Sequence, residues 1–141
     1  MVSIEVIMAN IERLKKLTKQ TKADIREQED YLLDLEAFRS ATRSRQNAYF
    51  DNQSRRESEL NKVTSLSSRC RTAEVFYEGM HGMLTGGKHS VAAGNFDGAL
   101  AKINQAIEKC KAKISELKRK LRQYEKELEE WQAMLSAALA V

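Results

Sequence analysis

No proline interrupts this chain of 141 residues, and all six of its glycines lie between Gly79 and Gly98. Proline ends helices and glycine weakens them, so the stretches on either side of the glycine cluster can form long helices. A sheet fold needs turn residues about every ten positions, and these are missing outside the cluster. The sequence therefore predicts an all-α fold, either a long antiparallel helical hairpin or a three-helix coiled-coil-like bundle.

The clearest repeat lies between Ile103 and Ala138, where apolar residues follow one another at alternating spacings of four and three. This spacing persists for five heptads without a polar interruption, as in a helix that packs along a coiled-coil seam. Such a narrow seam requires partner helices. Its members are Ile103, Ile107, Cys110, Ile114, Leu117, Leu121, Tyr124, Leu128, Trp131, Leu135 and Ala138.

The pattern predicts one helical domain over 1–141, with helices at about 3–50, 54–85 and 95–139 and a glycine-rich turn at 86–94. Ser54 and Glu57 have the spacing of a capping box, which favours a helix start near position 54. The stretch 43–58 is nearly all polar, so a continuous helix through positions 50–54 stays open.

A turn centred near position 90 sets a register in which facing residue numbers sum to about 180. The register pairs Cys70 with Cys110 and Leu66 with Ile114, so that two apolar stripes meet in phase. The predicted hairpin core is Leu66, Cys70, Cys110, Ile114, Leu117 and Leu121. The glycine pair Gly86-Gly87 is expected to end the second helix.

The first helix carries a third apolar stripe that the hairpin does not need. Its centre is polar, at Thr18, Thr21 and Gln28, so we expect two separate apolar clusters that remain available to another protein. The tail from Met134 onward is apolar nearly all round, and the stretch from Trp131 to Leu139 is expected to act with these clusters. The predicted partner-binding residues are Ile4, Ile7, Ile11, Leu14, Leu32, Leu35, Phe38, Trp131, Leu135 and Leu139.

Charge and chemistry narrow the function classes. The net charge is +4 with both signs interleaved, as on a solvated helix surface, although the basic stretch from Arg39 to Arg71 could contact nucleic acid. The histidines, His81 and His89, are expected in the turn, and the two cysteines at core positions. We therefore expect no enzyme, metal, cofactor or small-molecule substrate. The apolar tail is too short to span a bilayer.

Two long helices joined near an aromatic-x-Gly motif, here Tyr77-x-Gly79, resemble the Trp-x-Gly small helical hairpins of type VII secretion. The length, the absence of proline and the leucine- and isoleucine-rich heptads of both ends resemble the YwqH-like branch of that group more closely. That resemblance implies a partner of LXG polymorphic toxins in Gram-positive bacteria. Tyrosine replaces the tryptophan. The Tyr-x-x-x-Asp/Glu export signal is absent, because the residue four positions after Tyr124 is Leu128. The resemblance therefore implies that a partner supplies the signal.

The leading hypothesis is a non-enzymatic, chaperone-like helical adaptor that binds the helical N-terminal domain of an LXG-type toxin and promotes its type VII export. One alternative is a structural homo-oligomeric coiled-coil component, and another is a basic nucleic-acid-associated helical module. No secretory signal is visible, because Lys15 and Lys16 interrupt the first apolar stretch. We expect a cytoplasmic protein, or one exported without a cleavable signal peptide.

Overall fold

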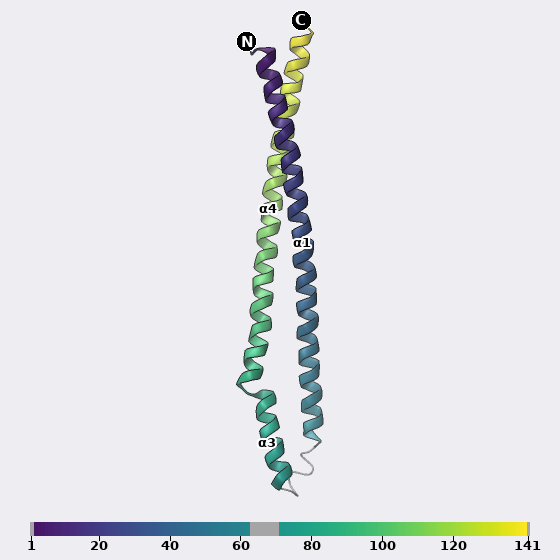
Figure 1. The fold of residues 1–141 in the computed structure, drawn as a ribbon, viewed down its shortest axis with the longest axis vertical. Coiled ribbons are helices and arrows are strands. Elements are labelled where there is room, and N and C mark those ends of the chain that lie inside the picture. The colour runs from purple at the N-terminus through teal and green to yellow at the C-terminus, as the bar shows by residue number, and fades with distance from the viewer. Residues whose placement is uncertain (1, 63–70, 141) are drawn as a thin grey trace. The chain divides into compact units, whose positions relative to one another are not determined.

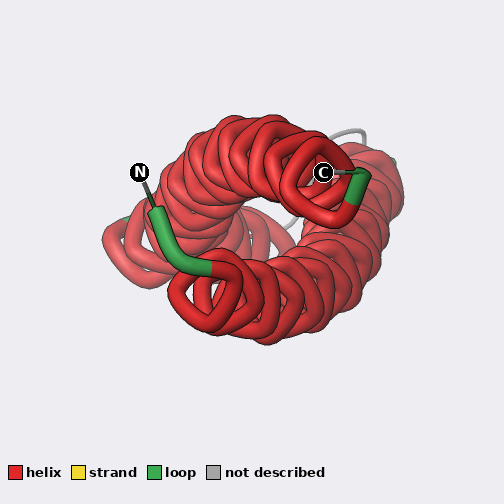
Figure 2. The backbone as a smooth tube through the Cα atoms, turned by 90° about the horizontal axis from the view of Figure 1, so that it is seen from above, coloured by secondary structure: helices red, strands yellow, loops and turns green. Residues whose placement is uncertain are grey.

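The computed structural model describes residues 2–62 and 71–140. Within these residues the chain forms helix α1 (Ile4–Asn61), helix α3 (Arg71–Thr85) and helix α4 (Gly87–Leu139) (Figure 1). The described residues contain no strand, and Figure 2 draws them as helix apart from short loop segments. The prediction of an all-α helical hairpin is confirmed.

The chain was expected to be one domain, and its contacts separate into two compact units. The terminal unit consists of Met1–Leu35 and Ala106–Val141, and the central unit consists of Glu36–Gln105. Helices α1 and α4 each contribute to both units.

The terminal unit is an antiparallel pair made by the first part of α1 and the last part of α4, which lie side by side in Figure 1. The direction follows from the residues that line shared grooves. Ile11 lies in a groove with Leu135, and Ile25 lies in another groove with Leu121, so rising numbers in α1 meet falling numbers in α4.

The core of the terminal unit follows the heptad positions of both helices. Leu14 is 0% exposed and Ile107 is 1% exposed, and burial of such a side chain is worth about 1.5–3 kcal/mol. Along α4, every seam position from Ile107 to Ala138 is buried or half-buried, which confirms the predicted buried face of this helix. The other buried apolar residues of the unit are Ile7, Ile11, Ile25, Cys110 and Ile114.

Polar residues occupy part of the α1 face. Thr18 and Thr21 are buried there, and the Thr21 hydroxyl donates to the carbonyl of Leu17 at 2.7 Å. The Thr18 hydroxyl has no hydrogen-bond partner. Across the pair, the Cys110 thiol donates to the backbone carbonyl of Gln28 at 3.2 Å, which ties α4 to α1.

The central unit places the last part of α1 against α3 and the first part of α4. Arg39 donates to Asn104 at 3.2 Å, and Gln46 donates to Asp97 at 3.3 Å. The Tyr77 hydroxyl of α3 donates to the side-chain oxygen of Asn61 at 3.4 Å. The first two contacts show that α4 runs antiparallel to the last part of α1.

The predicted end of the first helix near position 50 is wrong. Helix α1 runs without a break to Asn61, so Ser54 and Glu57 lie inside it and form no capping box. Its inward positions beyond Leu35 continue at heptad spacing, but with polar residues that an apolar pattern does not detect. They are Arg39, Thr42, Gln46, Tyr49 and Gln53, all buried or half-buried.

The predicted turn at 86–94 is also wrong, because α4 begins at Gly87 and residues 87–94 are helical. Glycine permits a turn without requiring one, and none of the glycines has a positive φ. Only Gly86 lies outside a helix, where a Cβ would collide with the carbonyl oxygen of Gly82. A glycine is therefore needed at this junction.

The predicted register, in which facing residue numbers sum to about 180, depended on a turn near position 90 and is therefore wrong as well. Cys110 and Ile114 are buried in the terminal unit, where the partner helix is α1, and Leu117 and Leu121 are half-buried there. The predicted opposite residues, Leu66 and Cys70, lie outside the described residues. The four α4 residues are core residues as predicted, but of a hairpin with a different partner helix.

Candidate partner-binding surfaces

The predicted partner-binding residues divide by exposure. Ile7, Ile11 and Leu14 are buried, because this part of α1 packs on α4 within the terminal unit. They hold the hairpin together and are not a free surface. Their assignment to partner binding is therefore corrected.

The remaining predicted residues keep some accessible surface. Ile4 and Leu139 are exposed at the end of the terminal unit, and Trp131 and Leu135 are half-buried beside them. Further along α1, Leu32 and Leu35 are half-buried at inward positions. Phe38, in the central unit, is exposed.

A distinct apolar patch, here called the terminal surface, occupies the end of the terminal unit. Its exposed apolar members are Val2, Ile4, Val6, Met8, Met134 and Leu139. One of them, Met8, lines a groove of about 590 Å³ together with Ala9, Ile11 and Leu135, with Glu5, Glu12 and Lys15 also at its wall. The stretch 131–140 carries no charged residue, and 2–11 carries one.

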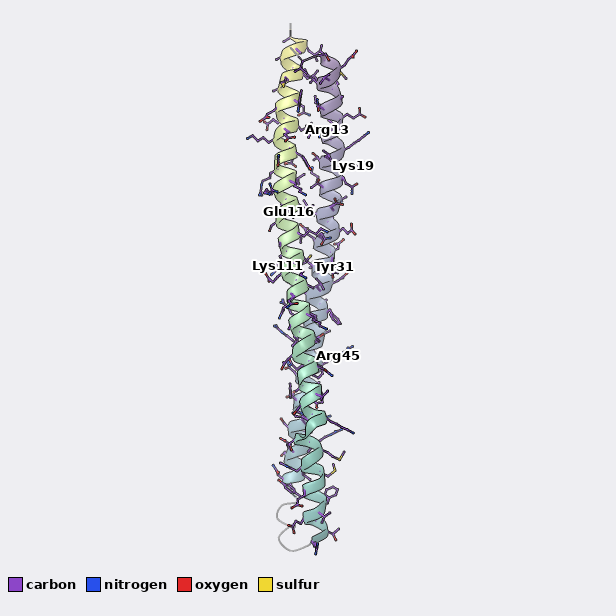
Figure 3. All side chains as sticks on the ribbon, turned by 90° about the vertical axis from the view of Figure 1, so that its left-hand side faces the viewer. Arg13, Lys19, Tyr31, Arg45, Lys111 and Glu116 are labelled. Atoms are coloured by element: carbon purple, nitrogen blue, oxygen red, sulfur yellow. The ribbon has the colours of Figure 1, made fainter. Side chains whose placement is uncertain are left out.

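Charged side chains become frequent farther along both helices of this unit. Figure 3 labels Arg13 and Lys19 on α1, and Lys111 and Glu116 on α4, and these side chains are exposed. One ion pair between the helices, Lys118 with Glu29 at 3.7 Å, involves half-exposed side chains and adds little stability. The segments 2–11 and 131–140 therefore differ from the rest of the unit in carrying few charged residues.

The central unit holds a second apolar surface that the sequence pattern did not predict. A groove of about 380 Å³, here called the α3 groove, lies between α1 and α3 and is lined by Gln53, Arg56, Glu59, Leu60, Phe76, Met80, Met83 and Leu84. Phe76 is 54% exposed and Met83 is 70% exposed. Neither residue belongs to the hairpin core predicted from the sequence. Apolar residues of this segment beyond those needed for the predicted core were the sequence signal that could have indicated this surface.

An aromatic layer adjoins this groove. The Tyr49 ring stacks on His89 with centroids 5.7 Å apart, and the Tyr49 hydroxyl lies 3.0 Å from His89 Nδ1. Gln53 Nε2 donates to the same hydroxyl at 3.0 Å, whereas Gln53 Oε1 is buried without a partner. His89 was expected to be a turn residue, and it is instead a half-buried part of the α1–α4 contact in the central unit.

The proposed turn motif lies in helix. Tyr77 and Gly79 are inside α3, and the Tyr77 ring stacks on His81 with centroids 5.5 Å apart. Gly86 separates α3 from α4, and Gly87 is the first residue of α4. The aromatic-x-Gly motif is thus near the chain reversal in sequence, but it does not form a turn itself.

The basic residues between positions 39 and 62 are mostly exposed. Arg39 is the exception, being half-buried and bonded to Asn104. Exposed acidic residues such as Asp51 and Glu59 alternate with the basic ones. A nucleic-acid contact stays a prediction.

Two features are absent from the described residues. No group of three or more His, Cys, Asp or Glu side chains there is arranged to hold a metal ion. No helix in that part of the chain has both the length and the apolar character needed to cross a membrane.

Comparison with known proteins adds no relative. No protein-family model, no curated protein and no solved structure matches the chain.

Proposed function

We propose that this chain is a non-enzymatic helical adaptor that docks on a helical segment of another protein through the terminal surface. The observation that supports this most is the group of exposed apolar side chains at the end of the terminal unit, where charged residues are few. Contiguous exposed apolar patches on soluble chains commonly mark protein interfaces.

The form of the terminal surface suits a helical partner. Met8 and Ile11 on α1 and Leu135 on α4 line a groove between the two helices, and further exposed apolar side chains lie at the same end of the unit. An amphipathic helix laid in such a groove would contact it through residues spaced three and four apart. Side chains such as Val or Met contribute about 1.5–3 kcal/mol each when fully buried, so a few of them suffice for a stable complex.

The resemblance to the YwqH-like branch supplies a specific partner. On that basis the partner is the helical N-terminal domain of an LXG-type toxin, and the adaptor promotes its type VII export. The antiparallel pairing of helices within each unit supports the proposal, as does the place of Tyr77-x-Gly79 in α3, where Tyr77 contacts the end of α1. The tyrosine in place of tryptophan and the missing export signal leave it without a motif of its own for export.

The test is a charge substitution on the terminal surface with a matched control. In the double variant Val6→Glu, Met8→Glu, two exposed apolar side chains become charged without entry into the hairpin core. Leu33→Glu is the control, because Leu33 is 63% exposed, compared with 56% for Met8, and lies in the same unit outside the terminal surface. Co-expression with the genes beside the coding sequence, followed by affinity purification, measures the complex.

We expect the double variant to bind the partner at least about tenfold more weakly, because a loss of about 1.4 kcal/mol of binding free energy is enough for that change in affinity. Leu33→Glu should retain it, and circular dichroism should be the same for both variants. A complex that survives the double substitution contradicts the proposal. If instead the wild-type chain self-associates and the double variant becomes monomeric, the homo-oligomeric alternative is supported.

A further inference from the structure

The terminal unit contains another groove between α1 and α4, here called the basic groove, with a volume of about 420 Å³. Four of its lining residues are cations and one is acidic. Lys118 pairs with Glu29 at 3.7 Å, but the other three cations form no ion pair with another described residue. The lining residues are Lys22, Ile25, Arg26, Glu29, Lys118, Leu121 and Arg122.

The basic groove lies on the same flank of the helix pair as the groove lined by Met8 and Leu135, here called the Met8 groove. In a coiled-coil pair, residues two heptads apart on one helix hold equivalent positions against the other helix. Each α1 residue of the basic groove lies two heptads after a residue of the Met8 groove, and Leu121 lies two heptads before Leu135. The α1 equivalents are Met8 and Lys22, Ile11 and Ile25, Glu12 and Arg26, and Lys15 and Glu29. Two heptads span about 21 Å of helix, so one straight segment could occupy both grooves.

We propose that the helix docked on the terminal surface continues along this flank and carries acidic residues where it crosses the basic groove. The proposal rests on the adaptor function and adds the charge of the partner. Apolar residues of the partner helix would contact Ile25 and Leu121, which lie between the two walls of the groove. Acidic residues on either side would bind Arg26 of α1 and Arg122 of α4, since guanidinium groups pair well with carboxylates.

The opposite flank of the pair has a different charge. Asp24 and Arg26 lie on opposite sides of Ile25, because successive helix residues are about 100° apart. The groove on the Asp24 side has two acidic residues and one cation among its lining residues, which are Asp24, Glu27, Gln28, Lys113 and Leu117. An acidic helix is therefore attracted to one flank and not to the other, and charge selects the side on which it docks.

The lining of the basic groove favours a helix over a nucleic acid. None of its residues is aromatic, so it offers no surface on which a base could stack. The carboxylate of Glu29 would repel a phosphate backbone, whereas a helix can place a neutral or basic residue beside it. A helix also supplies apolar side chains to cover Leu121, which is half-buried.

The test measures the binding of labelled helical peptides to the full chain by fluorescence anisotropy. Each peptide has leucines at heptad spacing and is long enough to cover both grooves. The first peptide has glutamates on both sides of the leucine stripe in one half, and matched peptides have glutamine or lysine at the same positions. We expect the glutamate peptide to bind about three- to tenfold more tightly than the glutamine peptide, the effect of two partly exposed ion pairs. High salt should reduce this difference. The lysine peptide should bind most weakly.

Charge reversal then tests the position of the site. The double variant Arg26→Glu, Arg122→Glu should bind the lysine peptide more tightly than the glutamate peptide, which reverses the wild-type order. The control is Arg13→Glu, Lys113→Glu, which changes the net charge equally and also alters one exposed cation on each helix of the unit. Lys113 lines the opposite groove, and Arg13 lies two heptads before Glu27 of that groove. The control should keep the wild-type order, and circular dichroism should be the same for both variants.

Equal binding of the glutamate and glutamine peptides would overturn the proposal, as would a reversed order in the control. Inorganic phosphate or a DNA duplex that binds more tightly than the glutamate peptide, and loses binding in Arg26→Glu, Arg122→Glu, would indicate a phosphate site instead. Co-purification separates this proposal from the adaptor function. If Val6→Glu, Met8→Glu loses the partner and Arg26→Glu, Arg122→Glu retains it fully, the adaptor function stands and the acidic-helix proposal is wrong.

Discussion

The two buried threonines of α1 provide a sharp test of the structure, because they differ in one hydrogen bond. Thr18 and Thr21 are 9% and 7% exposed on the same inward face, but only the Thr21 hydroxyl has a partner, the carbonyl of Leu17. Valine has nearly the size of threonine and a similar helix propensity. Replacement by valine therefore removes a hydroxyl and changes little else.

The expected effects differ in size. A buried polar group without a partner costs about 1–3 kcal/mol, so Thr18→Val should raise the free energy of unfolding by about 1–2 kcal/mol. For a chain of this length that corresponds to a rise in Tm of roughly 3–8 °C. At Thr21 the loss of a hydrogen bond, worth about 0.5–1.5 kcal/mol, offsets the gain from apolar burial. Thr21→Val should change stability by less than about 0.5 kcal/mol.

Urea unfolding measures both variants. Circular dichroism follows the helices, and the fluorescence of Trp131, the one tryptophan of the chain, follows the terminal unit that contains both threonines. The slope of the free energy against urea should not change, so the midpoint alone reports stability. If Thr18→Val lowers the midpoint, or if Thr21→Val raises it by as much as Thr18→Val, the hydrogen-bond assignment is wrong.

Two further substitutions test the junction and the register. Gly86→Ala should destabilise the chain, because its Cβ would meet the carbonyl oxygen of Gly82, whereas Gly79→Ala, in open space inside α3, should add about 0.5–1 kcal/mol; thermal unfolding compares the two. Gln28→Cys, combined with Cys70→Ser, should form a disulfide with Cys110 within one chain under mild oxidation. The 3.2 Å between the Cys110 sulfur and the carbonyl oxygen of Gln28 indicates that the two positions are close enough. Gel mobility detects the disulfide, and cross-linked dimers alone would contradict the register.

The helical content and the buried face of α4 could be predicted from the sequence for a simple reason. The stripe from Ile107 to Ala138 is apolar at each position, and the burial of apolar surface contributes most of the free energy of helix packing. The same positions are the buried or half-buried ones in the structure. Where a pattern is made of leucine and isoleucine, it identifies the face correctly.

The end of α3 and the start of α4 could not be predicted in the same way, because glycine permits a turn but is also tolerated inside a helix. The cluster between Gly79 and Gly98 indicated a turn, but the α4 seam continues through it at His89, Ala93 and Phe96 with the same spacing of four and three. These residues are a histidine, an alanine and a phenylalanine, so the hydrophobic pattern of the seam is weaker there than in the leucine- and isoleucine-rich part of α4. A heptad that persists across glycines is better read as a helix than as a turn.

The pairing of α4 with α1 in the central unit could not be predicted, because the pattern of apolar residues is missing on one of the two helices. Beyond Leu35 the inward face of α1 is polar, and hydrophobic periodicity gives no signal there. The terminal surface was partly predicted, since two of its exposed members, Ile4 and Leu139, were among the predicted partner-binding residues. The buried residues Ile7 to Leu14 were assigned to a partner protein because the predicted register already paired the last helix with the helix at 54–85.

The polar inward face of α1 in the central unit has a physical consequence for register. An apolar seam tolerates a shift by one heptad, because isoleucine then meets another aliphatic residue at nearly the same spacing. A shifted helix in the central unit would separate Gln46 from Asp97 and Tyr49 from His89, and would leave half-buried polar groups without partners. The alternative registers are thereby penalised even though each polar contact adds little stability. The polar pairs of the central unit thus specify which residues of α1 and α4 face each other there, and the apolar seam supplies most of the packing energy in the terminal unit.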